Sequence, residues 1–516
     1  MTNESIGHLG VVGRVALTVL AIYPVVMIVL ATRQGPGISI DSVSYAASAS
    51  SWAESGQLRS YDGRELSIFP VGLPVVIGSV MAAGLSLSSG VILTNVIATA
   101  LTVLAAYFLG REVLRSPGLA LLTAAFVALA ASSVRVGSYF WTEPVFTMLL
   151  SWALVITARA VRMRAGSWWI PVAVGTLITA TTMYRYVGIV ALPVLALGVA
   201  YAATSKRITK GVSVLLIGSI GIAFSAGRNL LYGAPALGER YPGSIESQGA
   251  LLGLVKLWGE YVAPSITTSL TVVAGSIVLV LIAVGVWTVL IDRNGPGILI
   301  ASYVVIYWVA ILVSQVGTRL DVATERFGAP ALAPSVVLVL LAARGLIRSM
   351  SRQVGSALGR DSSGVHRVLA SLSIVVLVGV VGLSILHAIR FVSEGTSGGL
   401  GLDSVAAGDR ALSRAARDIP MGTVIASNDP WQVWWERGSG VVLDYPPSRS
   451  EWPAERVEAD IDRLVSAVKS EGSLIVLLDE GSRVSLPVDE LQDLGLVTRE
   501  RGVQSGVAAW ELRSAN

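Results

Sequence analysis

Long apolar runs recur along most of the chain, and they constrain its fold more than any other feature. A helix of about 20 apolar residues crosses the hydrocarbon layer of a bilayer, which is about 30 Å thick. The sequence is 53% hydrophobic and 14% charged, whereas charged residues make up about 25% of a soluble domain. Runs that predict transmembrane helices lie at 11–32, 89–110, 118–137, 144–161, 168–182, 186–203, 212–227, 268–291, 296–315, 329–348 and 368–391. We therefore expect a mainly α-helical, polytopic membrane protein with about 11 transmembrane helices.

One further apolar stretch, 69–87, is interrupted by Pro70, Gly72, Pro74 and Gly84. Whether this stretch crosses the membrane decides on which side the basic loops lie. Basic loops are enriched on the cytoplasmic side. If 69–87 does not cross, the basic residues between spans fall on the side of the N-terminus: Arg111, Arg115, Arg159, Arg162, Arg164, Lys206, Arg207, Lys210, Arg293 and the cluster from Arg344 to Arg367. We therefore expect a cytoplasmic N-terminus and an interfacial helix at the outer face. The segments expected outside are 33–68, 138–144, 228–267, 316–328 and everything after 392.

The composition changes near residue 393, where charged residues return. Strand-like runs (GTVIAS, GSLIVLLD and GVAAWEL) follow one another there, and AERVEADIDRLVSAVKS has the pattern of a helix. We therefore expect two domains, a transmembrane domain at 1–392 and a small extracytoplasmic α/β domain at 393–516.

The residue types that are missing exclude several kinds of chemistry. The chain has no cysteine, which excludes disulfides and thiolate catalysis, and its three histidines do not suit a histidine-rich metal site. A metal would need carboxylate ligands, so we assign no cofactor and keep a divalent cation as a candidate. We expect membrane lipid as a partner and no nucleic acid.

Ionisable residues at the edges of the spans are the candidates for function, because a charge at the centre of a membrane helix costs about 2.5–3.5 kcal/mol on insertion scales. On the expected outer side they are Asp41, Glu143 in YFWTEP, Arg185 in TMYRYVG, Arg228 and Arg240 in GRNLLYGAPALGERYPG, and Glu325 with Arg326 in DVATERFGAP. Aromatic residues accompany them: Tyr45, Trp52, Tyr139, Trp141, Tyr184 and Tyr186. Arginine binds phosphate bidentately and aromatic rings stack on sugars, so this combination suits an anionic, lipid-linked substrate and a hydroxyl-rich acceptor.

Each of these residues also has a purely structural interpretation. Interfacial arginines contact lipid headgroups. Glu143, just before Pro144, complements the dipole at the start of a helix. Asp41 suits the N-cap of a helix at 42–55.

The order of the motifs resembles that of the GT-C superfamily. An early-loop Asp41 is followed by the proline-punctuated FPVGLP, by TEP at the outer end of the third span, by R-Y-x-G after the fifth, and by ERFGAPALAP at a late span. GT-C proteins are polytopic glycosyltransferases that include the protein O-mannosyltransferases and the lipid A aminoarabinose transferases. The resemblance covers roughly residues 11–391.

The resemblance implies roles for individual residues. Asp41 matches the first-loop aspartate that acts as the catalytic base, and Glu143 matches the second acidic position. Arg326 matches the arginine beside the donor phosphate, and Arg185 is a looser match to a basic residue there. Ser42 stands where the O-mannosyltransferases carry a second acid, which puts protein O-mannosylation in doubt.

The chemistry expected from these residues is an inverting sugar transfer at the outer face. A polyprenyl-phosphate sugar carries a good leaving group, so Arg326, with Arg185 or Arg228, would stabilise the departing phosphate. Asp41 would take the proton of the acceptor hydroxyl, and a single base opposite the leaving group implies inversion. The remaining candidate substrate-binding residues are Arg240, Tyr45 and Tyr139. The acceptor is a glycan, lipid or protein of the cell envelope.

A secondary transporter or lipid flippase with an extracytoplasmic domain is the alternative. Transporters carry paired broken helices and polar sites near the membrane midplane. Here the charges collect at one edge, and the long first outer loop has no counterpart in a second half of the sequence. These features favour the glycosyltransferase.

Overall fold

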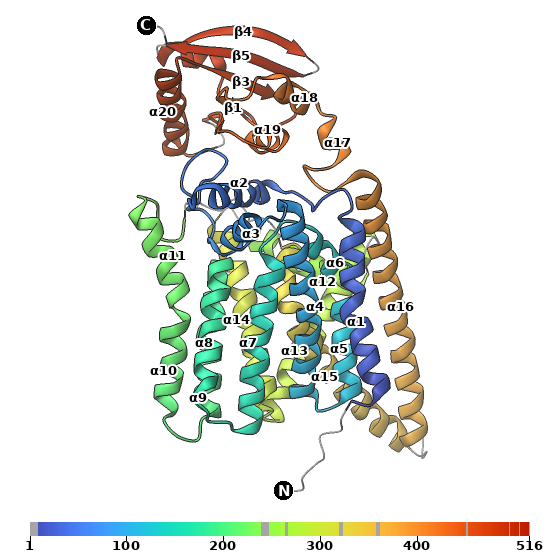
Figure 1. The fold of residues 1–516 in the computed structure, drawn as a ribbon. Helices are drawn as coiled ribbons and strands as arrows, with labels where there is room; N and C mark the ends of the chain where they lie inside the picture. The colour runs from blue at the N-terminus through green and yellow to red at the C-terminus, as the bar shows by residue number, and fades with distance from the viewer. Residues whose placement is uncertain are drawn as a thin grey trace. The chain divides into compact units, whose positions relative to one another are not determined.

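A computed structural model describes residues 9–238, 247–263, 267–318, 323–357, 362–449, 452–494, 496–504 and 506–514 (Figure 1). Their contacts divide the chain into two compact units, each of which takes segments from several parts of the sequence. The bundle unit comprises Met1–Ala31, Ser67–Gly72 and Ile92–Ser393. The sheet unit comprises Thr32–Leu66, Leu73–Val91 and Glu394–Asn516.

The helices of the bundle unit follow the apolar runs of the sequence. They are α1 (Val11–Ala31), α4 (Leu87–Leu114), α5 (Pro117–Leu129), α6 (Ala131–Ser138), α7 (Glu143–Met163), α8 (Trp169–Tyr184), η1 (Tyr186–Val190), α9 (Ala191–Ala202), α10 (Arg207–Gly218), α11 (Ile220–Leu231), α12 (Ser247–Val262), α13 (Thr268–Ile291), α14 (Gly295–Gly317), α15 (Glu325–Ala357) and α16 (Ser362–Gly398). The first residues of α4 and the last of α16 belong to the sheet unit.

The described residues contain eight helices long and apolar enough to cross a membrane, or nine if α5 and α6 form one bent span. The other two runs of the expected eleven form shorter apolar helices, Trp169–Tyr184 and Tyr186–Ala202. The break between these two helices lies at Arg185, whose backbone is extended (φ −150°, ψ 129°). The interrupted stretch 69–87 contains α3 (Gly72–Ala82), whose 11 residues are too few to cross the bilayer at 1.5 Å per residue.

Two prolines shape the start of α15. Proline has no N–H, so Pro334 leaves the carbonyl of Pro330 without its helical donor. The hydroxyl of Tyr303, on α14, donates to that carbonyl at 3.3 Å. One turn further along α14, Tyr307 donates to the carbonyl of Phe327 at 2.8 Å. These bonds fix the first turns of α15 against α14.

The sheet unit contains a five-stranded sheet in the order β2-β1-β3-β5-β4. Its strands are β1 (Ile425–Ser427), β2 (Val442–Asp444), β3 (Ser473–Asp479), β4 (Leu496–Gln504) and β5 (Val507–Ser514). β2, β1 and β3 are parallel, and β5 is antiparallel to β3 and β4. The helices of this C-terminal part are α17 (Val405–Gly408), α18 (Ala411–Asp418), α19 (Pro430–Arg437), α20 (Ala454–Glu471) and the 3-10 turn η2 (Val488–Leu494). The predicted mainly α fold with a small C-terminal α/β region is confirmed.

The segment after α1 packs with the sheet. The NH of Leu402 donates to the carbonyl of Ile38 at 2.9 Å, and the NH of Val442, at the start of β2, donates to that of Tyr61 at 3.0 Å. The Tyr61 hydroxyl also donates to Asp444 Oδ2 at 3.1 Å. Helix α2 (Ile40–Ser55) lies between these two attachments in the sequence. The segment that carries Asp41 is thus held to the C-terminal residues by backbone and side-chain bonds.

The orientation expected from the basic loops can be tested with single cysteines, because the native chain has none. Ser55, Ser205 and Ser397 are exposed and suit the substitution. We expect an impermeant maleimide to label Ser55→Cys and Ser397→Cys in intact cells, and Ser205→Cys only after the membrane is opened. Labelling of position 205 but not of 55 in intact cells would overturn this orientation.

Candidate active site

Glu143 opens α7 as a completely buried carboxylate. Pro144 follows in the first turn, where a missing N–H costs nothing, and an acid there complements the helix dipole. The Thr142 hydroxyl donates to Glu143 Oε2 at 3.3 Å. The YFWTEP motif therefore ends a turn and places the Glu143 carboxylate in the interior of the bundle unit.

Two arginines converge on the same oxygen of Glu143. Arg185 donates through its Nη1 to Glu143 Oε1, and the Nε of Arg326 lies 2.8 Å from that atom. Arg185 stands at the break between α8 and η1, while Arg326 is the second residue of α15. One carboxylate and two guanidiniums give the cluster a net charge of +1.

The guanidiniums remain accessible although the carboxylate is not. The side chains of Arg185 and Arg326 are 19% and 16% exposed, against 0% for Glu143. Arg326 lies 4.5 Å from the centre of the Trp141 ring, and Arg185 lies 5.6 Å from that of Phe327. Aromatic faces attract cations and hold the planar groups in one orientation. The cluster can therefore present N–H donors to an incoming anion.

The Trp141 ring is positioned by its neighbours. Tyr139 stacks on it with the ring centres 4.4 Å apart and 18° between the planes. The turn itself is held by Asn95 of α4, whose amide donates to the carbonyls of Gly137 at 2.9 Å and Tyr139 at 2.8 Å. Sequence reasoning did not select Asn95, because a single amide inside an apolar run carries no motif.

The structure brings together three of the candidate residues, Glu143, Arg185 and Arg326, with Tyr139 stacked beside them on Trp141. Arg228 lies in the last turn of α11, where its guanidinium stands 5.0 Å from the centre of the Tyr232 ring. Arg240 lies outside the described residues.

Asp41 and Tyr45 belong to α2 in the sheet unit. The helix begins at Ile40, and Ser39 is its N-cap in a capping box with Ser42. The expectation that Asp41 caps a helix at 42–55 is therefore wrong, because the cap position falls two residues earlier. Asp41 is a half-buried residue of the first turn, and Tyr45 is only 3% exposed.

Comparisons with known proteins agree with this architecture. Residues 70–227 match the family model described as dolichyl-phosphate-mannose-protein mannosyltransferase. No curated protein sequence matches the chain. ArnT from Cupriavidus metallidurans bound to undecaprenyl phosphate is similar in structure, with a TM-score of 0.58, 13% identity, and 97% of this chain and 98% of that chain covered. The oligosaccharyltransferase AglB from Archaeoglobus fulgidus, in complex with an inhibitory peptide and a dolichol-phosphate, has a TM-score of 0.54 at 12% identity, with 91% and 69% covered.

At these identities the structural likenesses show the fold. The predicted resemblance to the GT-C superfamily is confirmed by the family match together with the ArnT-like and AglB-like fold. These findings support a GT-C glycosyltransferase and a protein with several membrane spans.

The burial of Glu143 predicts a cost when its charge is removed. Glu143→Gln removes the charge that pairs with both guanidiniums, and breaking a buried ion pair costs about 3–5 kcal/mol. Because both arginines are partly exposed, we expect about 3 kcal/mol, seen as a lower thermal unfolding temperature of the purified protein.

Glu112 provides a matched control. This buried carboxylate at the end of α4 also pairs with two arginines, Arg162 at 2.6 Å and Arg159 at 3.6 Å. Glu112→Gln should destabilise the protein comparably. An unfolding temperature unchanged by Glu143→Gln would show that the carboxylate does not organise its cluster.

Proposed function

We propose that the chain is an inverting glycosyltransferase that moves a sugar from a polyprenyl-phosphate-linked donor to a cell-envelope acceptor at the outer face of the membrane. The observation that carries this proposal is the cluster of Glu143, Arg185 and Arg326, which is positively charged and accessible. The ligands bound in the two structural neighbours, undecaprenyl phosphate and dolichol-phosphate, support a lipid phosphate as the group that binds there.

The arginines act on the leaving group. When the bond between the anomeric carbon and the phosphate oxygen breaks, its electron pair leaves with the phosphate, whose negative charge increases. Arg185 and Arg326 are already oriented by Glu143 and by the aromatic rings, so they stabilise this charge without reorganising. Glu143 is fully buried behind its arginines, and we assign it to holding them and not to proton transfer.

Asp41 completes the reaction as the general base. The acceptor hydroxyl attacks the anomeric carbon from the face opposite the phosphate, and its proton passes to the Asp41 carboxylate. One displacement from the opposite face inverts the anomeric configuration. The role of Asp41 rests on its match to the first-loop aspartate of the GT-C superfamily and on its place in the first turn of α2.

The residues of the arginine cluster do not suit a divalent cation. The neighbours of the single carboxylate are themselves cations, and the described residues contain no group of three or more His, Cys, Asp or Glu side chains that could hold a metal ion. The chemistry proposed at Glu143 therefore uses the two guanidiniums.

Asp41→Asn tests the proposed base. Ser39 caps α2, so the substitution leaves the cap intact and removes the carboxylate that would accept the proton. With a polyprenyl-phosphate sugar as donor, we expect turnover to fall by about 10²–10⁴-fold while donor affinity stays unchanged. The measurement is sugar transfer by the purified, full-length protein.

Glu54→Gln is the matched control, because it removes an exposed carboxylate from the same helix. It should transfer sugar like the native protein. Near-normal turnover of Asp41→Asn would remove Asp41 from the mechanism. A native protein that moves the donor across vesicle membranes but transfers no sugar would instead favour the transporter or flippase.

A further inference from the structure

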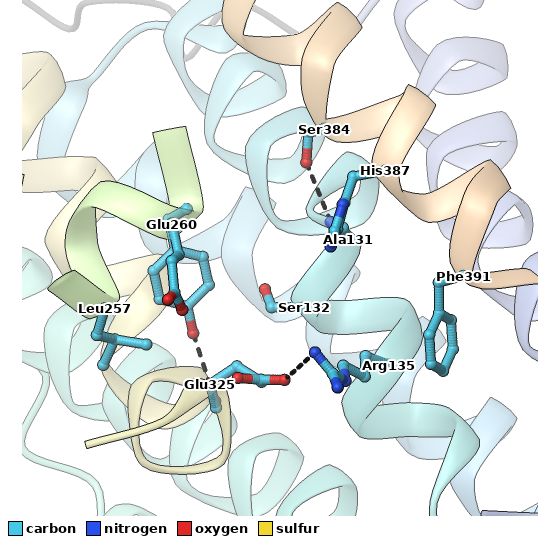
Figure 2. A pocket seen from close by; sticks show the side chains of 10 residues that line it. Ala131, Ser132, Arg135, Leu257, Glu260, Glu325, Ser384, His387 and Phe391 are labelled. Carbon is cyan, nitrogen blue, oxygen red and sulfur yellow. Dashed lines mark hydrogen bonds and ion pairs between the residues drawn. The ribbon is translucent and has the colours of Figure 1, made fainter. Parts of the chain in front are cut away.

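A pocket of about 250 Å³ opens in the bundle unit beside the first turn of α15 (Figure 2). Its walls come from α6, α12, α15 and α16. The lining residues used below are Ser132, Arg135, Glu260, Tyr261, Glu325 and Phe391. Of these residues the sequence singled out Glu325 alone, as a charged candidate without an assigned role.

The pocket adjoins the arginine cluster but faces away from it. Glu325 and Arg326 are consecutive residues of α15. Arg326 pairs with Glu143, whereas the Oε1 of Glu325 lies 3.0 Å from the Nη1 of Arg135. Figure 2 shows Arg135 and Glu325 pointing toward each other across the pocket. Two side chains of one helical turn thus serve two different sites.

The two sites differ in the sign of their charge. The pocket contains the carboxylates of Glu260 and Glu325 and the guanidinium of Arg135, so with His387 neutral its net charge is −1. The arginine cluster has a net charge of +1. A phosphate would be attracted to the cluster and repelled by the pocket.

The chemistry of the pocket suits hydroxyl groups. Ionised carboxylates only accept hydrogen bonds, guanidiniums only donate them, and the Ser132 hydroxyl does both. The rings of Phe391 and Tyr261 add apolar wall, and Tyr261 is fixed by a 3.4 Å bond from its hydroxyl to the carbonyl of Glu325. The volume lies below the range of about 300–1,000 Å³ that is usual for drug-sized ligands, which favours a small ligand.

We propose that this pocket binds one uncharged, hydroxyl-rich sugar residue and rejects anionic sugars. This inference rests on the proposed function, which supplies the two sources of such a sugar, the donor headgroup and the acceptor glycan. The pocket and the arginine cluster then divide recognition between them, with hydroxyls bound on one side of the first turn of α15 and phosphate on the other.

A cysteine placed in the pocket gives a test that does not depend on catalysis. In the purified, full-length Ser132→Cys protein the introduced thiol is the only one, because the native chain has none. The probes are methyl glycosides of glucose, mannose, galactose and arabinose, together with methyl glucuronide and decaprenyl phosphate. We expect at least one neutral glycoside to slow maleimide labelling severalfold, and the glucuronide and decaprenyl phosphate to leave it unchanged. The exposed Ser205→Cys is the control, and no probe should protect it.

Glu260→Gln tests the origin of the charge discrimination. In the Ser132→Cys background it removes the excess carboxylate, so the preference for a neutral glycoside over the glucuronide should fall by about tenfold or more. Glu471→Gln, which removes an exposed carboxylate of the sheet unit, should leave that preference unchanged.

Three results would overturn the proposal: no glycoside protects the thiol introduced by Ser132→Cys, the glucuronide protects it as well as neutral sugars do, or decaprenyl phosphate protects it. If Ser132→Cys does not fold, or if its thiol is not labelled even without a probe, saturation-transfer NMR of the same glycosides on the native protein decides the question. Absence of transfer to every neutral glycoside then contradicts the proposal. In transfer assays, inhibition competitive with the donor assigns the pocket to the donor sugar, and inhibition competitive with the acceptor assigns it to the acceptor. If a neutral glycoside protects the thiol but the protein transfers no sugar, the pocket binds a sugar as proposed and the proposed function is refuted.

Discussion

The buried carboxylate of Glu143 determines how the candidate active site is built. Taking an ion out of water is costly, and the cost is offset only when the counter-ions are close and well oriented. Arg185 and Arg326 meet this requirement from the break after α8 and from α15, so one carboxyl oxygen joins residues that lie 42 and 183 positions away in the sequence. The two guanidiniums together carry one positive charge more than the carboxylate that holds them.

The first turn of α15 carries one residue of the arginine cluster, Arg326, and one residue of the pocket, Glu325. Tyr303 and Tyr307 bond to carbonyls of α15 near the prolines, so the turn that carries Glu325 and Arg326 is fixed against α14. A shift of this turn would move both side chains at once, because consecutive helical residues share one rigid backbone. The same fixed turn therefore positions one side chain of the arginine cluster and one side chain of the pocket.

Much of this architecture can be predicted from the sequence, and the features that cannot be predicted have physical reasons. Hydropathy predicted the spans because a bilayer imposes one length on every crossing helix. Glu143, Arg185 and Arg326 were selected from the sequence because an ionisable residue in a membrane helix costs free energy and is therefore a candidate for function. The sequence did not predict the roles of Asn95 and Arg135 or the attachment of Tyr61 to β2. Each depends on a partner distant in the sequence, which a local sequence pattern cannot identify. The alternative interpretation of Asp41 as a helix cap is wrong, because the backbone angles select the N-cap and Ser39 occupies it.

The proposed function depends on recognition of a lipid phosphate by the two arginines that Glu143 holds. The most direct measurement compares the affinity of the purified protein for decaprenyl phosphate with that for decaprenol, which has the same tail and no charge. The native protein should prefer the phosphate. Arg326→Ala should reduce this preference by about 10–100-fold, since a hydrogen bond to a charged group contributes about 1.5–3 kcal/mol, and Arg326→Lys should restore part of it. Arg162→Ala, taken from the ion pair of Glu112, should leave the preference unchanged. A preference that survives both Arg326→Ala and Arg185→Ala would show that these arginines do not recognise the phosphate.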